Sequence, residues 1–96
     1  MGMAQQNAID SLLHVLKQSG PDTNRIHTLN QLGRQLCQAK RYSEAMKFAR
    51  EADSLSLQLS FLSGRSEAYN NIGCTCLNQK QFEEARQYFN NGLRFA

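Results

Sequence analysis

The chain has 96 residues, 41% apolar and 20% charged, and eleven basic against eight acidic side chains give a net charge of +3. This length allows one small domain, and the near-average composition excludes a disordered or fibrous chain. No apolar run approaches the roughly 20 residues of a membrane-spanning helix. The positive charges are too few and too scattered to indicate a nucleic-acid-binding surface. Three cysteines, an odd number, exclude a disulfide framework.

The first predicted helix covers residues 4–19. Its apolar side chains recur with helical period at Ile9, Leu12, Leu13 and Leu16. Gly20 and Pro21 then end the pattern, and Asp22 is suited to cap the next helix. We interpret residues 4–22 as a capping helix that covers the open end of a helical stack.

Two further helices are predicted at residues 23–39 and 42–60. In each of them, apolar residues recur at spacings of three and four, which is the signature of a helix with one buried face. The link between them, around residues 39–41, is so short that the helices must run antiparallel. Residues 23–62 therefore form a first helical hairpin.

The remaining sequence, residues 63–96, repeats this hairpin with helices at 64–79 and 82–95. A shift of 40 residues aligns the two units. It makes five positions identical: Asn30/Asn70, Gly33/Gly73, Lys40/Lys80, Glu44/Glu84 and Ala45/Ala85.

Gly33 and Gly73 lie inside predicted helices, where glycine costs about 1 kcal/mol relative to alanine. We expect them to allow close approach of the paired helix, with small residues facing them: Ala45 and Ala49 in the first unit, and Ala85 in the second. A loop at each glycine is the alternative, but the apolar pattern continues through both positions.

The spacing resembles the tetratricopeptide repeat. The motif reads Leu29-x2-Leu32-Gly33-x2-Leu36 with Ala45-x3-Ala49, then Tyr69-x2-Ile72-Gly73-x2-Cys76 with Ala85-x3-Phe89. Departures are the missing aromatics at Leu36, Cys76 and Ala49, the missing terminal proline, and a unit longer than the usual length of about 34 residues. The resemblance implies an all-α fold, a right-handed α-solenoid of two hairpins plus the capping helix, with the second unit truncated at its C-terminal end.

Catalytic and metal-binding chemistry finds little support. His14 and His27 lie on different helices, without a cysteine or carboxylate at metal-ligand spacing. Cys74 and Cys76 point about 200° apart on a helix, so they cannot grip one ion. Cys37 and Cys74 are the only candidates for redox chemistry. We expect a non-enzymatic protein without catalytic residues, metal or cofactor.

The resemblance implies that the first helix of each unit lines a concave, peptide-binding surface. Amides can pair with an extended peptide backbone, and arginine can grip a carboxylate. The predicted peptide- or partner-binding residues are His27, Asn30, Gln31, Arg34, Asn70, Asn71 and Cys74, and Glu67 and Asn78 occupy similar positions. The alternative is that these polar residues are merely tolerated on a solvated helix face.

The last helix carries more apolar residues than one neighbouring helix can cover. Tyr88, Leu93 and Phe95 are expected to remain partly uncovered and to mediate self-association, so that the chain forms a homodimer. The alternative is a monomer with a frayed last turn.

A narrower resemblance concerns residues 60–73, which are similar to repeat junctions in the sensory regions of bacterial tetratricopeptide-containing histidine kinases. It implies a signal-transduction role and a periplasmic location; without it the protein is expected in the cytoplasm. The predicted function is protein–protein interaction, with no nucleic-acid partner and no membrane contact. The alternative, a basic nucleic-acid-binding module, would use Arg34, Arg41, Arg50 and Arg65.

Overall fold

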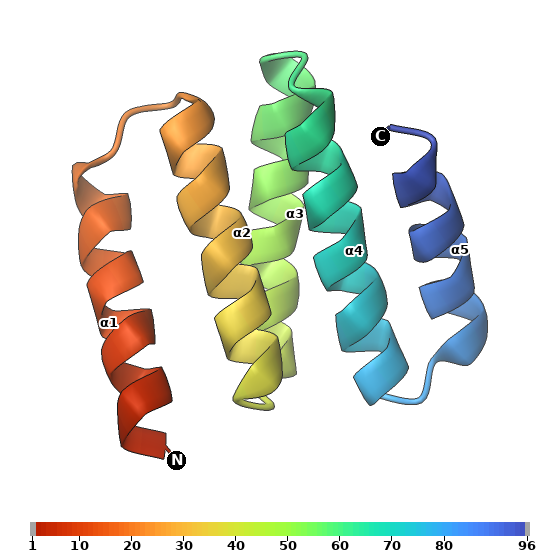
Figure 1. Ribbon diagram of the computed structural model, residues 1–96, viewed down its shortest axis with the longest axis horizontal. Helices are drawn as coiled ribbons and strands as arrows, with labels where there is room; N and C mark the ends of the chain where they lie inside the picture. Colours follow the sequence, from red (N-terminus) through yellow and green to blue (C-terminus); the bar gives the residue numbers. More distant parts are fainter. Residues whose placement is uncertain (1, 96) are drawn as a thin grey trace.

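The computed structural model describes residues 2–95, with side chains from Gln5 onward, and folds this range into five α-helices (Figure 1). They are α1 (Gly2–Gln18), α2 (Thr23–Gln38), α3 (Tyr42–Gln58), α4 (Leu62–Asn78) and α5 (Phe82–Leu93). Every bound lies within two residues of its expected position. The predicted all-α solenoid is confirmed, and none of the described helices is long and apolar enough to cross a bilayer.

The helices form two consecutive hairpins with a fifth helix at one end. α2 pairs with α3, and α4 pairs with α5, while α4 also packs against both α2 and α3. α1 lies beside α2, at the left of Figure 1, and the hairpin of α4 and α5 lies at the right. α2 and α4 are therefore neighbours in one layer, although about 40 residues separate them in the chain.

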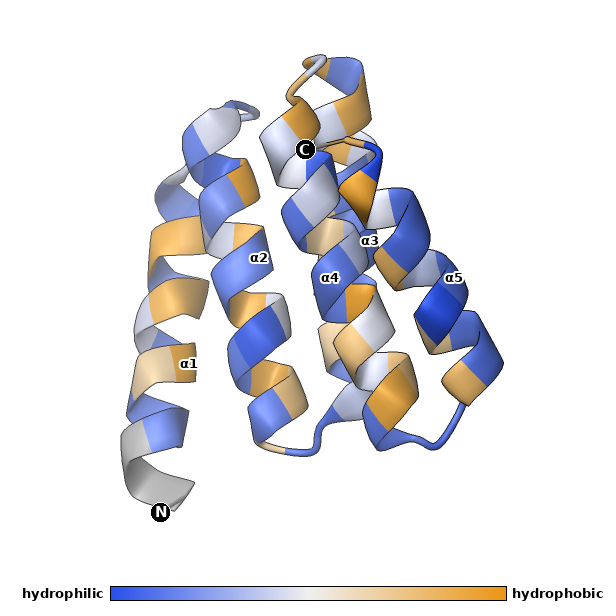
Figure 2. Ribbon diagram, turned by 45° about the vertical axis from the view of Figure 1, so that its right-hand side comes forward, coloured by the Kyte–Doolittle hydropathy of each residue, from blue (hydrophilic) through white to orange (hydrophobic). Residues whose placement is uncertain are grey.

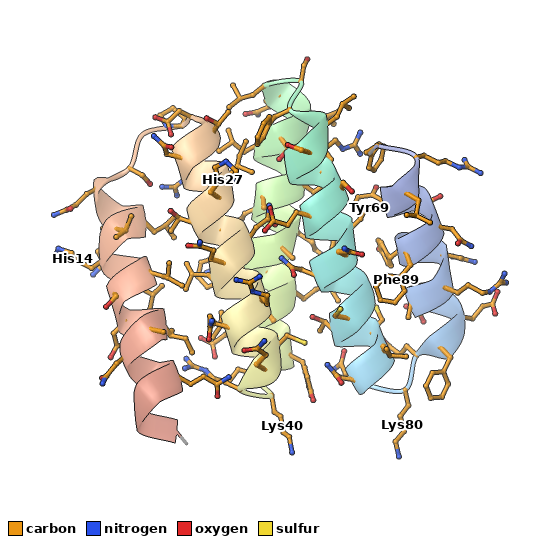
Figure 3. The ribbon with its side chains drawn as sticks, viewed as in Figure 1. His14, His27, Lys40, Tyr69, Lys80 and Phe89 are labelled. Carbon is orange, nitrogen blue, oxygen red and sulfur yellow. The ribbon has the colours of Figure 1, made fainter. Side chains whose placement is uncertain are left out.

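Three tight turns connect α2 to α5, and all three have the same backbone geometry. In each, one residue has a positive φ: 63° at Lys40, 53° at Ser60 and 64° at Lys80. The following N–H group donates to a carbonyl five residues earlier, in the pairs Arg41–Leu36 (2.9 Å), Phe61–Ser56 (2.8 Å) and Gln81–Cys76 (2.8 Å). This is the Schellman arrangement that ends a helix. Lys40 and Lys80 consequently project from the same edge of the molecule (Figure 3).

These turns yield a stability prediction, because side chains other than glycine are strained in the left-handed region. Lys80→Gly should raise the free energy of unfolding by about 0.5–1 kcal/mol. Lys47→Gly, in the middle of α3, should lower it by about 1 kcal/mol, since glycine there weakens a helix. Urea denaturation followed by circular dichroism measures both. Changes of the same sign would contradict the strain at Lys80.

The start of α2 follows the sequence prediction. The Asp22 carboxylate accepts a hydrogen bond from the backbone N–H of Arg25 at 3.1 Å, which caps the helix as expected. The Arg25 guanidinium in turn donates to the carbonyl of Leu16 at 3.0 Å, near the end of α1. This contact ties the connecting segment to both helices and positions α1 against α2.

The core divides into two apolar clusters. The larger one joins Ile9 and Leu16 of α1 to the leucines of α2 and to Ala45 and Ala52 of α3. The smaller one lies between the two hairpins and contains Ala49, Ile72, Cys76 and Ala85. Hydrophobic and hydrophilic segments alternate along the helices (Figure 2), as expected when each helix buries one face.

The predicted close approaches at the two glycines differ in detail. A methyl group added at Gly33 would lie 3.6 Å from the Ala49 side chain and 3.6 Å from the Ala45 carbonyl, so the expected neighbours are present. At Gly73 the nearest atoms belong to the ring of Phe89, at 2.9–3.1 Å. Ala85 is buried in one cluster with Ile72 and Cys76 of α4, and Phe89, one turn further along α5, fills the space directly at Gly73. Figure 3 shows Phe89 between α4 and α5.

Candidate functional site

A hollow of about 420 Å³ lies between α2 and α4, and we call it the α2–α4 hollow. All the side chains that line it come from the first helices of the two hairpins. They are Arg34, Cys37, Gln38, Glu67, Asn70, Asn71, Cys74 and Asn78. The site therefore depends on how α2 and α4 are placed relative to each other.

Two of the hydrogen bonds between these helices involve side chains that line the hollow. The Asn71 side-chain amide donates to the backbone carbonyl of Asn30 at 2.9 Å, and the Asn78 amide donates to Cys37 Sγ at 3.2 Å. Both bonds join residues that are 41 positions apart in the chain. These bonds hold the two helices together along the hollow.

Four of the seven predicted binding residues line the hollow: Arg34, Asn70, Asn71 and Cys74. Arg34, Asn70 and Cys74 are exposed, so a ligand can reach them. The other three, His27, Asn30 and Gln31, lie outside it. The ring of His27 packs edge-to-face against the ring of Phe61, in the α3–α4 turn, with 5.6 Å between the centroids. Gln31 is exposed but does not line the hollow.

Asn30 and Asn71 have structural contacts that the sequence reading did not anticipate. Asn30 is fully buried, and its amide donates to the backbone carbonyl of Gly64 at 3.2 Å. Asn71 is also buried and donates to the Asn30 carbonyl. Asn30 is therefore out of reach of a ligand, and Asn71 forms part of the wall of the hollow. The side-chain amides of both residues hold α4 against α2.

The charged groups of the hollow are of opposite sign. Arg34 is exposed on α2, and Glu67 is half-buried on α4. Among residues 5–95, neither of them takes part in an ion pair. Both charges remain open to a ligand, together with the exposed amides of Gln38 and Asn70.

Cys74, which lines the hollow, and Cys76, which lies outside it, both have raised thiol pKa values. Partial desolvation raises the pKa of the Cys74 thiol, with a smaller contribution from Cys37, and burial raises the pKa of Cys76. A raised pKa leaves a thiol protonated and weakly nucleophilic near neutral pH. Cys74 is exposed whereas Cys76 is buried, and the described residues contain no group of three or more side chains suited to a metal ion.

Cys37 and Gln38 line the hollow but were not among the predicted site residues. Their positions, three and four residues after Arg34, place them on the same face of α2 as that arginine. This spacing was a usable signal. It was missed because Cys37 also fits the apolar stripe of the helix, and it is in fact buried.

The three residues predicted to mediate self-association lie at the C-terminal end. The rings of Tyr88 and Phe95 pack edge-to-face on Tyr69, at 5.4 and 5.1 Å between centroids. The Arg65 guanidinium stacks on Phe95 at 4.4 Å and pairs with Asp53 at 2.9 Å. Leu93, in contrast, is 73% exposed. Self-association stays a prediction, and Leu93 is the most exposed of the three residues predicted to mediate it.

Comparisons with known proteins identify the repeats. Residues 25–52 and residues 66–96 each match a family model described as a tetratricopeptide repeat. Together these segments cover more than half of the chain, one in each hairpin. No curated protein and no solved structure matches the chain.

Proposed function

Since the chain belongs to the tetratricopeptide-repeat family, we propose that it binds another protein by holding an extended segment of it in the α2–α4 hollow. Tetratricopeptide repeats generally mediate protein–protein interactions. The observation that carries the proposal is the hollow itself, which gathers exposed amide and charged side chains from both repeats on one surface.

The chemistry of the hollow suits a peptide backbone. Asn70 and Gln38 each offer an amide donor and an amide acceptor, which match the N–H and C=O groups of an extended chain. Asn71 and Asn78 are held by their bonds to α2, so the walls are preorganised and little side-chain entropy is lost there on binding. A peptide can therefore bind without a large rearrangement of the two helices.

The nucleic-acid alternative is less well supported. Of the four arginines that suggested it, Arg41 pairs with Glu44 at 2.8 Å and Arg65 pairs with Asp53 at 2.9 Å. Arg34 lines the same hollow as Glu67, whose negative charge disfavours a phosphate there. Two of the four arginines are thus already paired with carboxylates.

The proposal is tested by selecting binders from a phage-displayed library of random linear peptides. Titrating a selected peptide into the isotopically labelled protein should shift the backbone amide signals of Asn70 and Cys74. Arg34→Ala should weaken binding by about fivefold, equivalent to about 1 kcal/mol, with an unchanged melting temperature. Lys17→Ala, which removes an exposed charge on α1, is the control and should leave binding unchanged.

Failure to select any peptide, or signal shifts confined to α3 and α5, would count against the hollow as the binding surface. A role in signal transduction is a separate matter. The matched families describe the repeat alone, and neither points to a histidine kinase, so that role stays a prediction.

A further inference from the structure

We infer that the chain has a second binding site, a cleft between the two hairpins that takes a small zwitterion, a molecule with one anionic and one cationic group. The cleft has a volume of about 400 Å³, and we call it the α3–α5 cleft. It shares no lining residue with the α2–α4 hollow, so it is independent of the proposed peptide binding.

The α3–α5 cleft lies where α3 of the first hairpin meets the second hairpin. Three of its side chains, Tyr42, Met46 and Arg50, come from α3. Opposite them the second hairpin contributes the turn between α4 and α5, together with Glu84 and Tyr88 of α5. Both repeats therefore build the cleft, and it exists only when the two hairpins are packed together.

Two opposite charges line the cleft. Arg50 on α3 and Glu84 on α5 are both exposed, and within residues 5–95 neither of them forms an ion pair, with each other or with another side chain. A ligand carboxylate beside Arg50 and a ligand ammonium beside Glu84 would each gain a partner. A ligand with two like charges would place one of them beside a group of its own sign, which disfavours binding.

The floor of the cleft lies within electrostatic reach of both charges. Cys76, which is buried, lines the cleft from the last turn of α4. Burial is the main cause that raises the pKa of its thiol, the Glu84 carboxylate raises it further, and the Arg50 guanidinium lowers it. One small molecule lying over Cys76 can therefore meet both charged groups.

Apolar side chains supply the surface between the charges. Met46 and Tyr88 are half-buried and pack against the apolar cluster that contains Cys76, while Tyr42 packs against the larger cluster of the first hairpin. Because this packing already restrains these side chains, they lose little freedom when a ligand binds. The volume lies near the lower end of the range of about 300–1,000 Å³ for small-molecule sites, which suits a ligand the size of an amino acid.

The test uses three compounds with the same carbon chain. 6-Aminohexanoate carries both charges, hexanoate carries only the anionic group, and hexylammonium carries only the cationic one. Each is titrated into the isotopically labelled protein, and the backbone amide signals of Ser43 and Gln81, which line the cleft from different hairpins, are followed by nuclear magnetic resonance. We expect these signals to shift and 6-aminohexanoate to bind about fivefold more tightly than either of the other compounds.

Two variants remove the preference in a defined way. Glu84→Gln should make 6-aminohexanoate bind no better than hexanoate, and Arg50→Gln should make it bind no better than hexylammonium. The controls Glu83→Gln and Lys47→Gln make the same changes of net charge at exposed positions of the same two helices, outside the cleft, and should retain the fivefold preference. Since all four positions are exposed, the melting temperatures should stay close to that of the parent protein.

The outcomes distinguish this site from the α2–α4 hollow. The absence of binding, equal binding of the three compounds, or an unchanged preference in both cleft variants would overturn the zwitterion site. Signal shifts confined to Asn70 and Cys74 would place the compounds in the hollow and would also overturn it. A peptide selection that fails would remove the proposed function but would leave the binding of 6-aminohexanoate at the α3–α5 cleft unaffected.

Discussion

Gly64→Ala should lower the free energy of unfolding by about 1–3 kcal/mol, although the change adds only one methyl group. Gly64 lies in the first turn of α4, where that helix crosses the first hairpin. The added carbon would meet Phe61 at 2.7 Å and Ile26 at 2.8 Å, and it would approach the hydroxyl of Ser56 more closely still. Ile26 is fully buried, so the neighbours cannot easily move away.

Gly33→Ala is the matched control, because this glycine is also buried inside a helix. Its added methyl group would lie 3.5–3.6 Å from its nearest neighbours, which is ordinary van der Waals contact. Alanine stabilises a helix relative to glycine, so this variant should gain about 0.5–1 kcal/mol. Chemical denaturation of both variants measures the two changes in the free energy of unfolding. Equal losses at the two positions would show that the contacts around Gly64 are not the cause.

Asn30→Ala should be the second strongly destabilising change, with a loss of about 2–3 kcal/mol. The Asn30 side chain is fully buried, and its amide donates to the Gly64 carbonyl at 3.2 Å. Truncation removes this bond between α2 and α4 and leaves a small cavity. The loss should appear as a lower midpoint of urea denaturation with an unchanged slope.

The repeat supplies the control for this prediction. Asn70 occupies the position of Asn30 in the second unit, but it is exposed, and no hydrogen bond of its side chain is found among the described residues. Asn70→Ala should therefore change the stability by no more than about 0.5 kcal/mol. If the two alanine variants were equally unstable, the bond between Asn30 and Gly64 would not explain the effect.

Asn71, like Asn30, contributes to the packing of α4 against α2. The sequence predicts Asn71 only as a peptide- or partner-binding residue. Its buried amide also holds the Asn30 carbonyl at 2.9 Å, so we expect Asn71→Ala to lose stability as well. Arg34, which is exposed on the same hollow, remains the position where binding can be changed without affecting the fold.

The sequence by itself determined the helices, their turns and the repeat. Helical periodicity, the capping carboxylate of Asp22 and the short link before Tyr42 are local signals, and local signals are enough to place a helix. The resemblance to the tetratricopeptide repeat also implied that polar residues of α2 and α4 share a surface. Arg34, Asn70 and Cys74 were found in this way.

Only the tertiary structure decided which of these polar residues a ligand can reach. Asn30 and Asn70 are the same residue at the same point of the repeat, yet α4 covers the first and no described helix covers the second. The same holds at the glycines: the tightest contact is at Gly64, where three separate segments meet, and not at the motif position Gly33. Burial depends on what packs against a residue from elsewhere in the chain, and the periodicity of its own helix carries no record of that neighbour.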